Sequence, residues 1–137
     1  MSKLLTRRFA PEPYSVHAAR RVCLELIGRI EPSVRDRMGL LVSELVSDSV
    51  RRLSGRAGAL IGIDIQRTDR GIRVRVTDPD DRSEPDGLRP LRRHGRSLIV
   101  VSALADDWGF GEGPGTEVWF ELCGAEAGDQ EPGMSSG

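Results

Sequence analysis

An apolar repeat of helical period between residues 38 and 45 constrains this chain more than any other feature. Met38, Leu41, Val42 and Leu45 recur at intervals of three and four residues, the spacing of a helix that buries one side. Ser33 precedes the repeat, with an acid three residues later, a pattern typical of a helix start. The repeat therefore predicts an amphipathic helix that ends near residue 52.

Acidic residues lie along the polar side of the same helix. Glu44 and Asp48 are four residues apart, so their carboxylates share one face, and Arg51 and Arg52 follow within a turn. Two interpretations stay open at this point. In one, the acids border a cleft; in the other, they belong to a solvated face with ion pairs one helical turn apart.

The composition fits one domain with an aliphatic core. The chain has 137 residues, of which 38% are apolar and only 4% aromatic. Its 20 Lys and Arg residues balance 21 Asp and Glu residues, which argues against a generally basic nucleic-acid-binding protein. Lys3 is the only lysine, a bias that suits a high-GC genome.

The sequence contains no run of 18 apolar residues and no signal-peptide core, so we expect a cytoplasmic protein with no contact with a membrane. Cys23 and Cys123 lie in apolar surroundings and lack metal-ligand spacing, so they are interpreted as small core residues in a reducing compartment. His17 and His94 have no second histidine or cysteine at ligand spacing, so they predict no metal site.

A strand and a helix are predicted before the central helix. Residues 4–9 form a short candidate edge strand, which Pro11 and Pro13 end. Ser15 is the expected cap of a first helix, whose apolar residues follow the helical period: Ala19, Val22, Cys23, Leu26, Ile27 and Ile30. Because both helices carry one apolar side, we expect them to cover the same face of a sheet.

The apolar period changes from helical to alternating after residue 60. Alternation over residues 61–65 and 72–76 predicts two strands joined by a turn at residues 69–71. Arg73 and Arg75 fall on the polar side of the second strand. The sheet should therefore have one covered face and one arginine-rich face.

The second half of the chain is predicted to contain a loop, a helix and two strands. Residues 79–96 are charged and contain prolines, which is typical of a functional loop or lid. Residues 98–105 predict a buried helix, residues 108–110 a short strand, residues 111–115 a tight turn, and residues 116–122 a last strand.

The fold class that follows is a two-layer α/β sandwich. Its sheet is expected to be mixed and mostly antiparallel, with the helices on one face. One domain spans residues 1–123, and the Gly-, Glu- and Ser-rich tail at residues 124–137 should be disordered.

Four short signals stand in order on this pattern. Each alone has a common structural explanation, such as turn formation by an aspartate. Together they resemble the nucleotide-binding Bergerat fold of the histidine-kinase-like ATPase superfamily. They are Glu44 with Asp48, then Asp78, the run Gly95-Arg96-Ser97-Leu98, and Gly115 with Thr116.

The nearer resemblance is to the small anti-sigma-factor serine/threonine kinases and their actinobacterial relatives. Residues 7–11 (RRFAP), 41–46 (LVSELV) and 115–120 (GTEVWF) are similar to stretches typical of that branch. The resemblance covers residues 9–122 and implies ATP and Mg²⁺ as cofactors.

The resemblance also implies roles for individual residues. Glu44 matches the family's general base, and Asp48 stands where the family has an asparagine that ligates Mg²⁺. Asp78 matches the aspartate that accepts a hydrogen bond from the adenine amino group. Thr116, after Gly115, matches a threonine that supports the adenine pocket.

The lid residues are placed by the same resemblance. Gly95 and Ser97 match a glycine pair at the end of an ATP lid, with Arg96 between them and Leu98 at the start of the following helix. In the family, backbone amides at that helix N-terminus receive phosphate oxygens.

Four positions depart from the family pattern. Asp48 replaces asparagine and adds a charge near Glu44, at a cost of roughly 2–4 kcal/mol for an effective dielectric near 20. Mg²⁺ or Arg52, which stands where histidine is frequent, could compensate for this charge. Asp80 replaces a small residue, and the Cβ of Ser97 replaces a lid glycine. The fold is kept while the pocket is eroded.

The lid is unusually rich in cations, and its role has two open interpretations. The cations could clamp phosphates or dock an acidic partner surface, or they could balance nearby acids in a solvated loop. No direct contact with nucleic acid is expected, because no aromatic residues interleave with them. They are Arg89, Arg92, Arg93, His94 and Arg96.

Two functions follow as hypotheses. In the first, the chain is an ATP·Mg²⁺-dependent kinase that phosphorylates a serine of an anti-anti-sigma (STAS-type) protein and sequesters a sigma factor, with a possible homodimer implied by the resemblance. In the second, the same fold binds partner proteins without catalysis. An Asp78 engaged in a salt link within the protein would favour the second.

Overall fold

The computed structural model describes residues 2–27, 32–79, 89–111 and 114–124, with the side chains of residues 89–95 outside the description. Its elements are, in chain order, β1 (Ser2–Phe9), α1 (Pro13–Ile27), α2 (Pro32–Arg52), β2 (Ile61–Arg67), β3 (Gly71–Asp78), α3 (Arg89–Leu104), β4 (Asp107–Phe110) and β5 (Thr116–Cys123).

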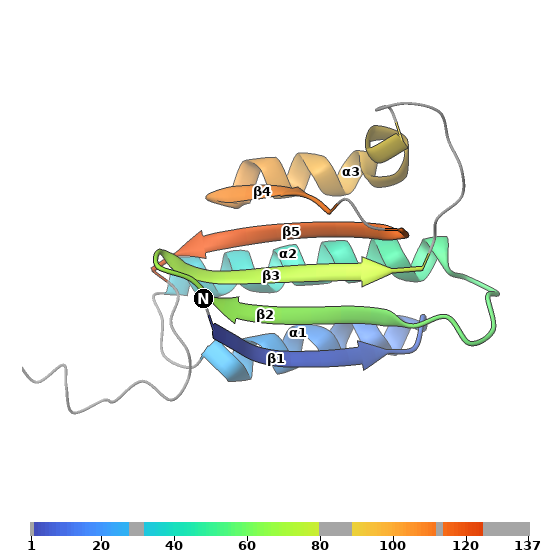
Figure 1. Cartoon of the computed structure of the whole chain (residues 1–137), viewed down its shortest axis with the longest axis horizontal. Helices are drawn as coiled ribbons and strands as arrows, with labels where there is room; N and C mark the ends of the chain where they lie inside the picture. The colour runs from blue at the N-terminus through green and yellow to red at the C-terminus, as the bar shows by residue number, and fades with distance from the viewer. Residues whose placement is uncertain (1, 28–31, 80–88, 112–113, 125–137) are drawn as a thin grey trace, which may run out of the picture.

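The described strands form one five-stranded sheet in the order β1-β2-β3-β5-β4. All four strand pairs are antiparallel, so the described part of the expected mixed sheet contains no parallel pair. Figure 1 shows the helices on one side of the sheet, with α2 behind its central strands and α1 behind β1 and β2. The predicted two-layer α/β sandwich is confirmed, and so is the edge position of β1.

The alternating residues divide the sheet into a covered face and an open face. Side chains that point toward the helices form the core together with the apolar sides of α1 and α2. This burial of aliphatic side chains is the main stabilising term of the fold. The largest fully buried side chains are Phe120, Ile27, Met38, Leu41, Leu53, Ile61, Ile63, Ile65, Ile72, Leu122, Val42 and Val46.

The first two helices begin at prolines, before the serines that were expected to cap them. Pro13 and Pro32 are the first residues of α1 and α2. Proline suits the first helical turn because the missing N–H has no intrahelical acceptor there. Ser15 and Ser33 consequently lie inside the helices, and the two cap predictions are wrong.

The lid prediction is also corrected in part. Helix α3 begins at Arg89, so residues 89–96 are helical and do not belong to a loop. Residues 80–88, with Asp80, lie outside the described part of the chain. The sequence predicted a buried helix, but the helix is amphipathic: Val101 is buried, whereas Ile99 is 70% exposed.

Of the elements predicted in the second half of the chain, the two strands are confirmed, whereas the turn and the tail lie partly or wholly outside the described residues. The strands at residues 108–110 and 116–122 are present as β4 and β5. The proposed turn at residues 111–115 is described only in part, and the tail beyond Gly124 is outside the description. Among the described residues, no helix has both the length and the apolar character needed to cross a membrane.

Candidate functional site

The candidate site starts on α2, where three charged residues repeat every fourth position. Glu44, Asp48 and Arg52 therefore lie along one side of the helix. That side is not a solvated face, because Asp48 is buried and Arg52 is nearly so. The ion pair one helical turn apart that the second interpretation expected is present between Asp48 and Arg52, but it is buried and not solvated.

Arg52 joins the helix to the end of β3. Its guanidinium donates hydrogen bonds to Asp48 Oδ2 and, over 2.5 Å, to Asp78 Oδ2. The side chain of Asp78 has 0% exposure, and that of Arg52 has 10%. Arg51 adds a second contact of 3.2 Å to Asp48 Oδ1. We name the four residues Asp48, Ser49, Arg52 and Asp78 the buried ion network.

Ser49 completes this network and was missed in the sequence. Its Oγ donates to Asp78 Oδ2 over 2.7 Å and accepts from Arg52 over 3.2 Å. Ser49 is fully buried and follows Leu45 by four residues on the apolar side of α2. A polar residue in that position was the available signal, because a buried hydroxyl needs a partner.

The last strand brings a second pair of candidate residues to this end of the sheet. Thr116 is buried and lies directly opposite Asp78 in the β3–β5 register. Gly115 has a φ of +83°, and a Cβ there would lie 2.5 Å from the Asp78 carbonyl oxygen. Glycine is therefore required at residue 115 for β5 to approach the end of β3.

Helix α3 contributes Arg96 and Ser97, but not in the predicted geometry. Gly95, Arg96 and Ser97 lie inside the helix rather than at its N-terminus. Backbone amides inside a helix are bonded to preceding carbonyls and are not available to phosphate oxygens. The predicted phosphate cradle at residues 95–98 is therefore not formed.

One side chain of α3 nevertheless reaches a site residue. The Arg96 guanidinium lies 3.8 Å from Glu44 Oε2, as a long ion pair at an exposed position. The Ser97 hydroxyl is buried without a hydrogen-bond partner, and Leu98 beside it packs inward. Of the predicted site residues, the structure brings together Glu44 with Arg96, and Asp48, Arg52, Asp78, Gly115 and Thr116 around the network.

The described residues do not fit ATP·Mg²⁺ as they are arranged. Adenine needs a free oxygen of Asp78, but this carboxylate is enclosed and Oδ2 already accepts two hydrogen bonds. A Mg²⁺ ion needs the Asp48 carboxylate, which is held by two guanidinium groups. No group of three or more potential metal ligands occurs within the described ranges.

Comparison with protein families places the chain. The family model of the histidine kinase-like ATPase domain matches residues 9–122, which is most of the sequence. This match and the fold place the chain in the histidine kinase-like ATPase domain family. No curated protein matches the chain.

Proposed function

We propose that this chain is a non-catalytic, protein-binding regulator of the anti-sigma-factor type, with a sigma factor and an anti-anti-sigma (STAS-type) protein as its partners. The observation that carries the proposal is the position of Arg52 between Asp48 and Asp78. The resemblance of residues 41–46 and 115–120 to the anti-sigma-factor branch supports the choice of partners.

A nucleotide that used Asp48 and Asp78 would have to displace Arg52. Removing one partner of a buried ion pair leaves uncompensated charges and typically costs about 3–5 kcal/mol. If ATP binding bore that cost, its affinity would fall by roughly two to four orders of magnitude. Millimolar ATP would then fail to fill the site.

A specific observation also favours a second candidate, an ATP-dependent serine/threonine kinase. Asp78 and Thr116, the two residues with expected adenine roles, are direct partners across β3 and β5. Glu44 is partly exposed and lies next to the exposed Arg96, as a general base and a phosphate ligand would require. In this alternative, Arg52 leaves the two carboxylates when nucleotide and Mg²⁺ bind.

Thermal unfolding with and without ATP and Mg²⁺ distinguishes the two candidates. We expect no change in Tm for the natural chain, because Arg52 keeps the site closed. The double variant Asp48→Asn with Arg52→His restores the residues typical of the family. It should regain a ligand-dependent rise in Tm, since ligand at a hundredfold excess over Kd stabilises by about 2.7 kcal/mol.

The matched control is Arg51→His with Asp48→Asn, which changes the neighbouring arginine and leaves Arg52 in place. A clear rise in Tm of the natural chain at millimolar ATP would overturn the non-catalytic proposal. Transfer of labelled phosphate to an anti-anti-sigma protein would then test the kinase. Loss of that transfer in Glu44→Ala would support the assigned base.

A further inference from the structure

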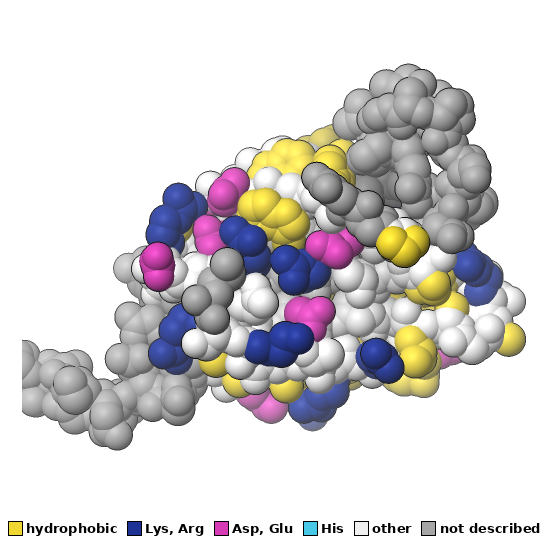
Figure 2. Space-filling view, in the orientation of Figure 1, with side chains coloured by type: hydrophobic (Ala, Val, Ile, Leu, Met, Phe, Trp, Pro, Cys, Tyr) yellow, Lys and Arg dark blue, Asp and Glu magenta, His cyan; other side chains and the backbone are white. Residues whose placement is uncertain are grey.

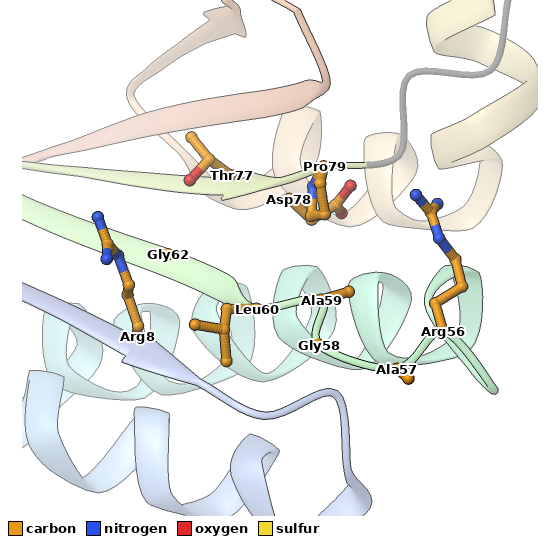
Figure 3. Close-up of a pocket in the computed structure, with 10 residues that line it drawn as sticks. All are labelled: Arg8, Arg56, Ala57, Gly58, Ala59, Leu60, Gly62, Thr77, Asp78 and Pro79. Carbon is orange, nitrogen blue, oxygen red and sulfur yellow. The ribbon is translucent and has the colours of Figure 1, made fainter.

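The open face of the sheet contains a hollow that meets the buried ion network only at Asp78. Its volume is about 530 Å³, and it lies between the ends of β1, β2 and β3 and the segment 56–60 that follows α2. Figure 3 shows Arg8 and Arg56 at its two ends, with Leu60 and Ala59 between them. Hollows of this size are typical of sites for small ligands or single side chains.

The hollow exists because two neighbouring positions of the open face, Gly62 and Thr77, carry no large side chain. Gly62 pairs with Thr77 across β2 and β3, and Arg8 pairs with Gly62 across β1 and β2. A Cβ at Gly62 would lie 2.7 Å from Thr77 Oγ1, so even an alanine would crowd the floor. Asp78 lines the hollow too, but its carboxylate belongs to the buried ion network.

The charges of the open face point to the chemistry of a ligand. Figure 2 shows cationic and anionic side chains interspersed over this face. Arg73, Arg75 and Lys3 are paired with Glu121, Glu117 and Asp64, at 3.7, 2.8 and 3.8 Å. The Arg8 side chain is different, because it forms no ion pair or hydrogen bond with any other residue in the described ranges.

The apolar part of the hollow lies next to this cation. Leu60 is 46% exposed, although it is a large hydrophobic residue, and Ala59 and Pro79 complete the apolar wall. A ligand whose anionic group pairs with Arg8 can therefore also place an adjacent aliphatic group in contact with Leu60. An arginine at the rim beside an exposed apolar residue fits a carboxylate better than a neutral ligand.

We propose that this hollow binds an acidic peptide segment of a partner protein. A glutamate or aspartate carboxylate pairs with Arg8, and the adjacent aliphatic side chain covers Leu60. The inference rests on the proposed function in one respect, because it gives the protein-binding role a site. It does not depend on whether the buried ion network admits ATP.

The test uses the full ¹⁵N-labelled chain and the capped tetrapeptide acetyl-Ala-Glu-Leu-Ala-amide, with the Gln peptide for comparison. We expect saturable shifts of the backbone amide signals of Leu60, Gly62 and Thr77 with the Glu peptide. Arg8→Ser should weaken binding about tenfold or more, the usual effect of removing a hydrogen bond to a charged group. Leu60→Ser should also weaken it.

Arg7→Ser is the matched control. Arg7 is also exposed and also unpaired within the described residues, but it pairs with Ile63 and so lies on the other side of β1. This variant should bind the Glu peptide like the natural chain. Equal binding of the Glu and Gln peptides, equal loss in both arginine variants, or shifts confined to other residues would overturn the site.

The two proposals fail separately. If ATP raises the Tm of the natural chain but the Glu peptide still binds through Arg8, only the non-catalytic function is overturned. If ATP has no effect and the Glu peptide fails to bind, only this site is overturned.

Discussion

At the scale of single residues, Arg52 has the largest expected effect on stability. It lies 26 residues from Asp78 in the sequence, yet its guanidinium joins that carboxylate to Asp48. Replacing it removes the guanidinium that joins two buried carboxylates and leaves Asp48 with the more exposed Arg51. Both the attraction that is lost and the repulsion that remains oppose folding.

We therefore predict that Arg52→Ala lowers the free energy of unfolding by about 3–5 kcal/mol. Arg51→Ala should lower it by less than about 1 kcal/mol, because the Arg51 side chain is 56% exposed and its pair with Asp48 is solvated. Urea unfolding of the two variants measures the difference. Equal effects would show that the pairing of Arg52 with Asp48 and Asp78 contributes little.

Gly115 gives a second prediction at this scale, about the backbone. Gly115→Ala should destabilise by about 2 kcal/mol or more, since φ is positive and the added Cβ meets the Asp78 carbonyl oxygen. Gly55 has a similar φ of +80° with nothing within 4 Å of an added Cβ. Gly55→Ala should therefore cost only the conformational part, about 1 kcal/mol, in the same urea experiment.

At the scale of elements, the covered face of α3 decides how this helix is held. Val101 is fully buried in the core, whereas Ile99, two residues earlier, points into solvent. Arg37 on α2 also donates to the Leu104 carbonyl over 3.0 Å, at the end of α3. The helix therefore depends on one apolar side and on the cap at its C-terminus.

We predict that Val101→Ala destabilises by roughly 1–3 kcal/mol, through lost burial and a cavity. Ile99→Ala should change stability by less than about 0.5 kcal/mol, because exposed substitutions away from special features are close to neutral. Circular dichroism during urea unfolding checks both variants. A larger loss for Ile99 would mean that a partner or another surface covers this side of α3.

At the scale of the whole molecule, the buried thiol of Cys23 makes the free energy of unfolding depend on pH. Complete burial raises the pKa of its thiol from 9.0 to about 12. The unfolded chain therefore ionises this thiol at lower pH than the folded chain does. The stabilising contribution is complete below pH 9 and falls as pH rises toward 12, by about 1.4 kcal/mol per unit.

The resulting prediction compares unfolding free energies at about pH 8 and about pH 10. The natural chain should lose more stability over this range than Cys23→Ala, in which the thiol is absent. Cys123→Ala is the control, because Cys123 is only partly buried. An identical pH dependence in all three chains would contradict the assigned linkage.

Periodicity determined much of the fold in advance. Apolar spacing placed α1, α2, β2, β3 and β5, and the alternation at residues 72–76 assigned Arg73 and Arg75 to the open face correctly. These features follow from local geometry, because a side chain's face is set by residues three, four or two positions away. The helix starts were predicted less well. A nearby serine was interpreted as the cap of each helix, whereas the proline before it is the first helical residue.

Candidate site residues could be named from the sequence, but their arrangement in space could not. Glu44, Asp48, Asp78 and Thr116 were identified from the sequence, and the register confirms that Asp78 and Thr116 are neighbours. Only the tertiary structure decided that Arg52 occupies both carboxylates and that residues 89–96 are helical. Such pairings form where elements distant in the sequence meet in the interior, and there the low dielectric strengthens the interaction between charges. A local sequence pattern does not show which distant residues will meet.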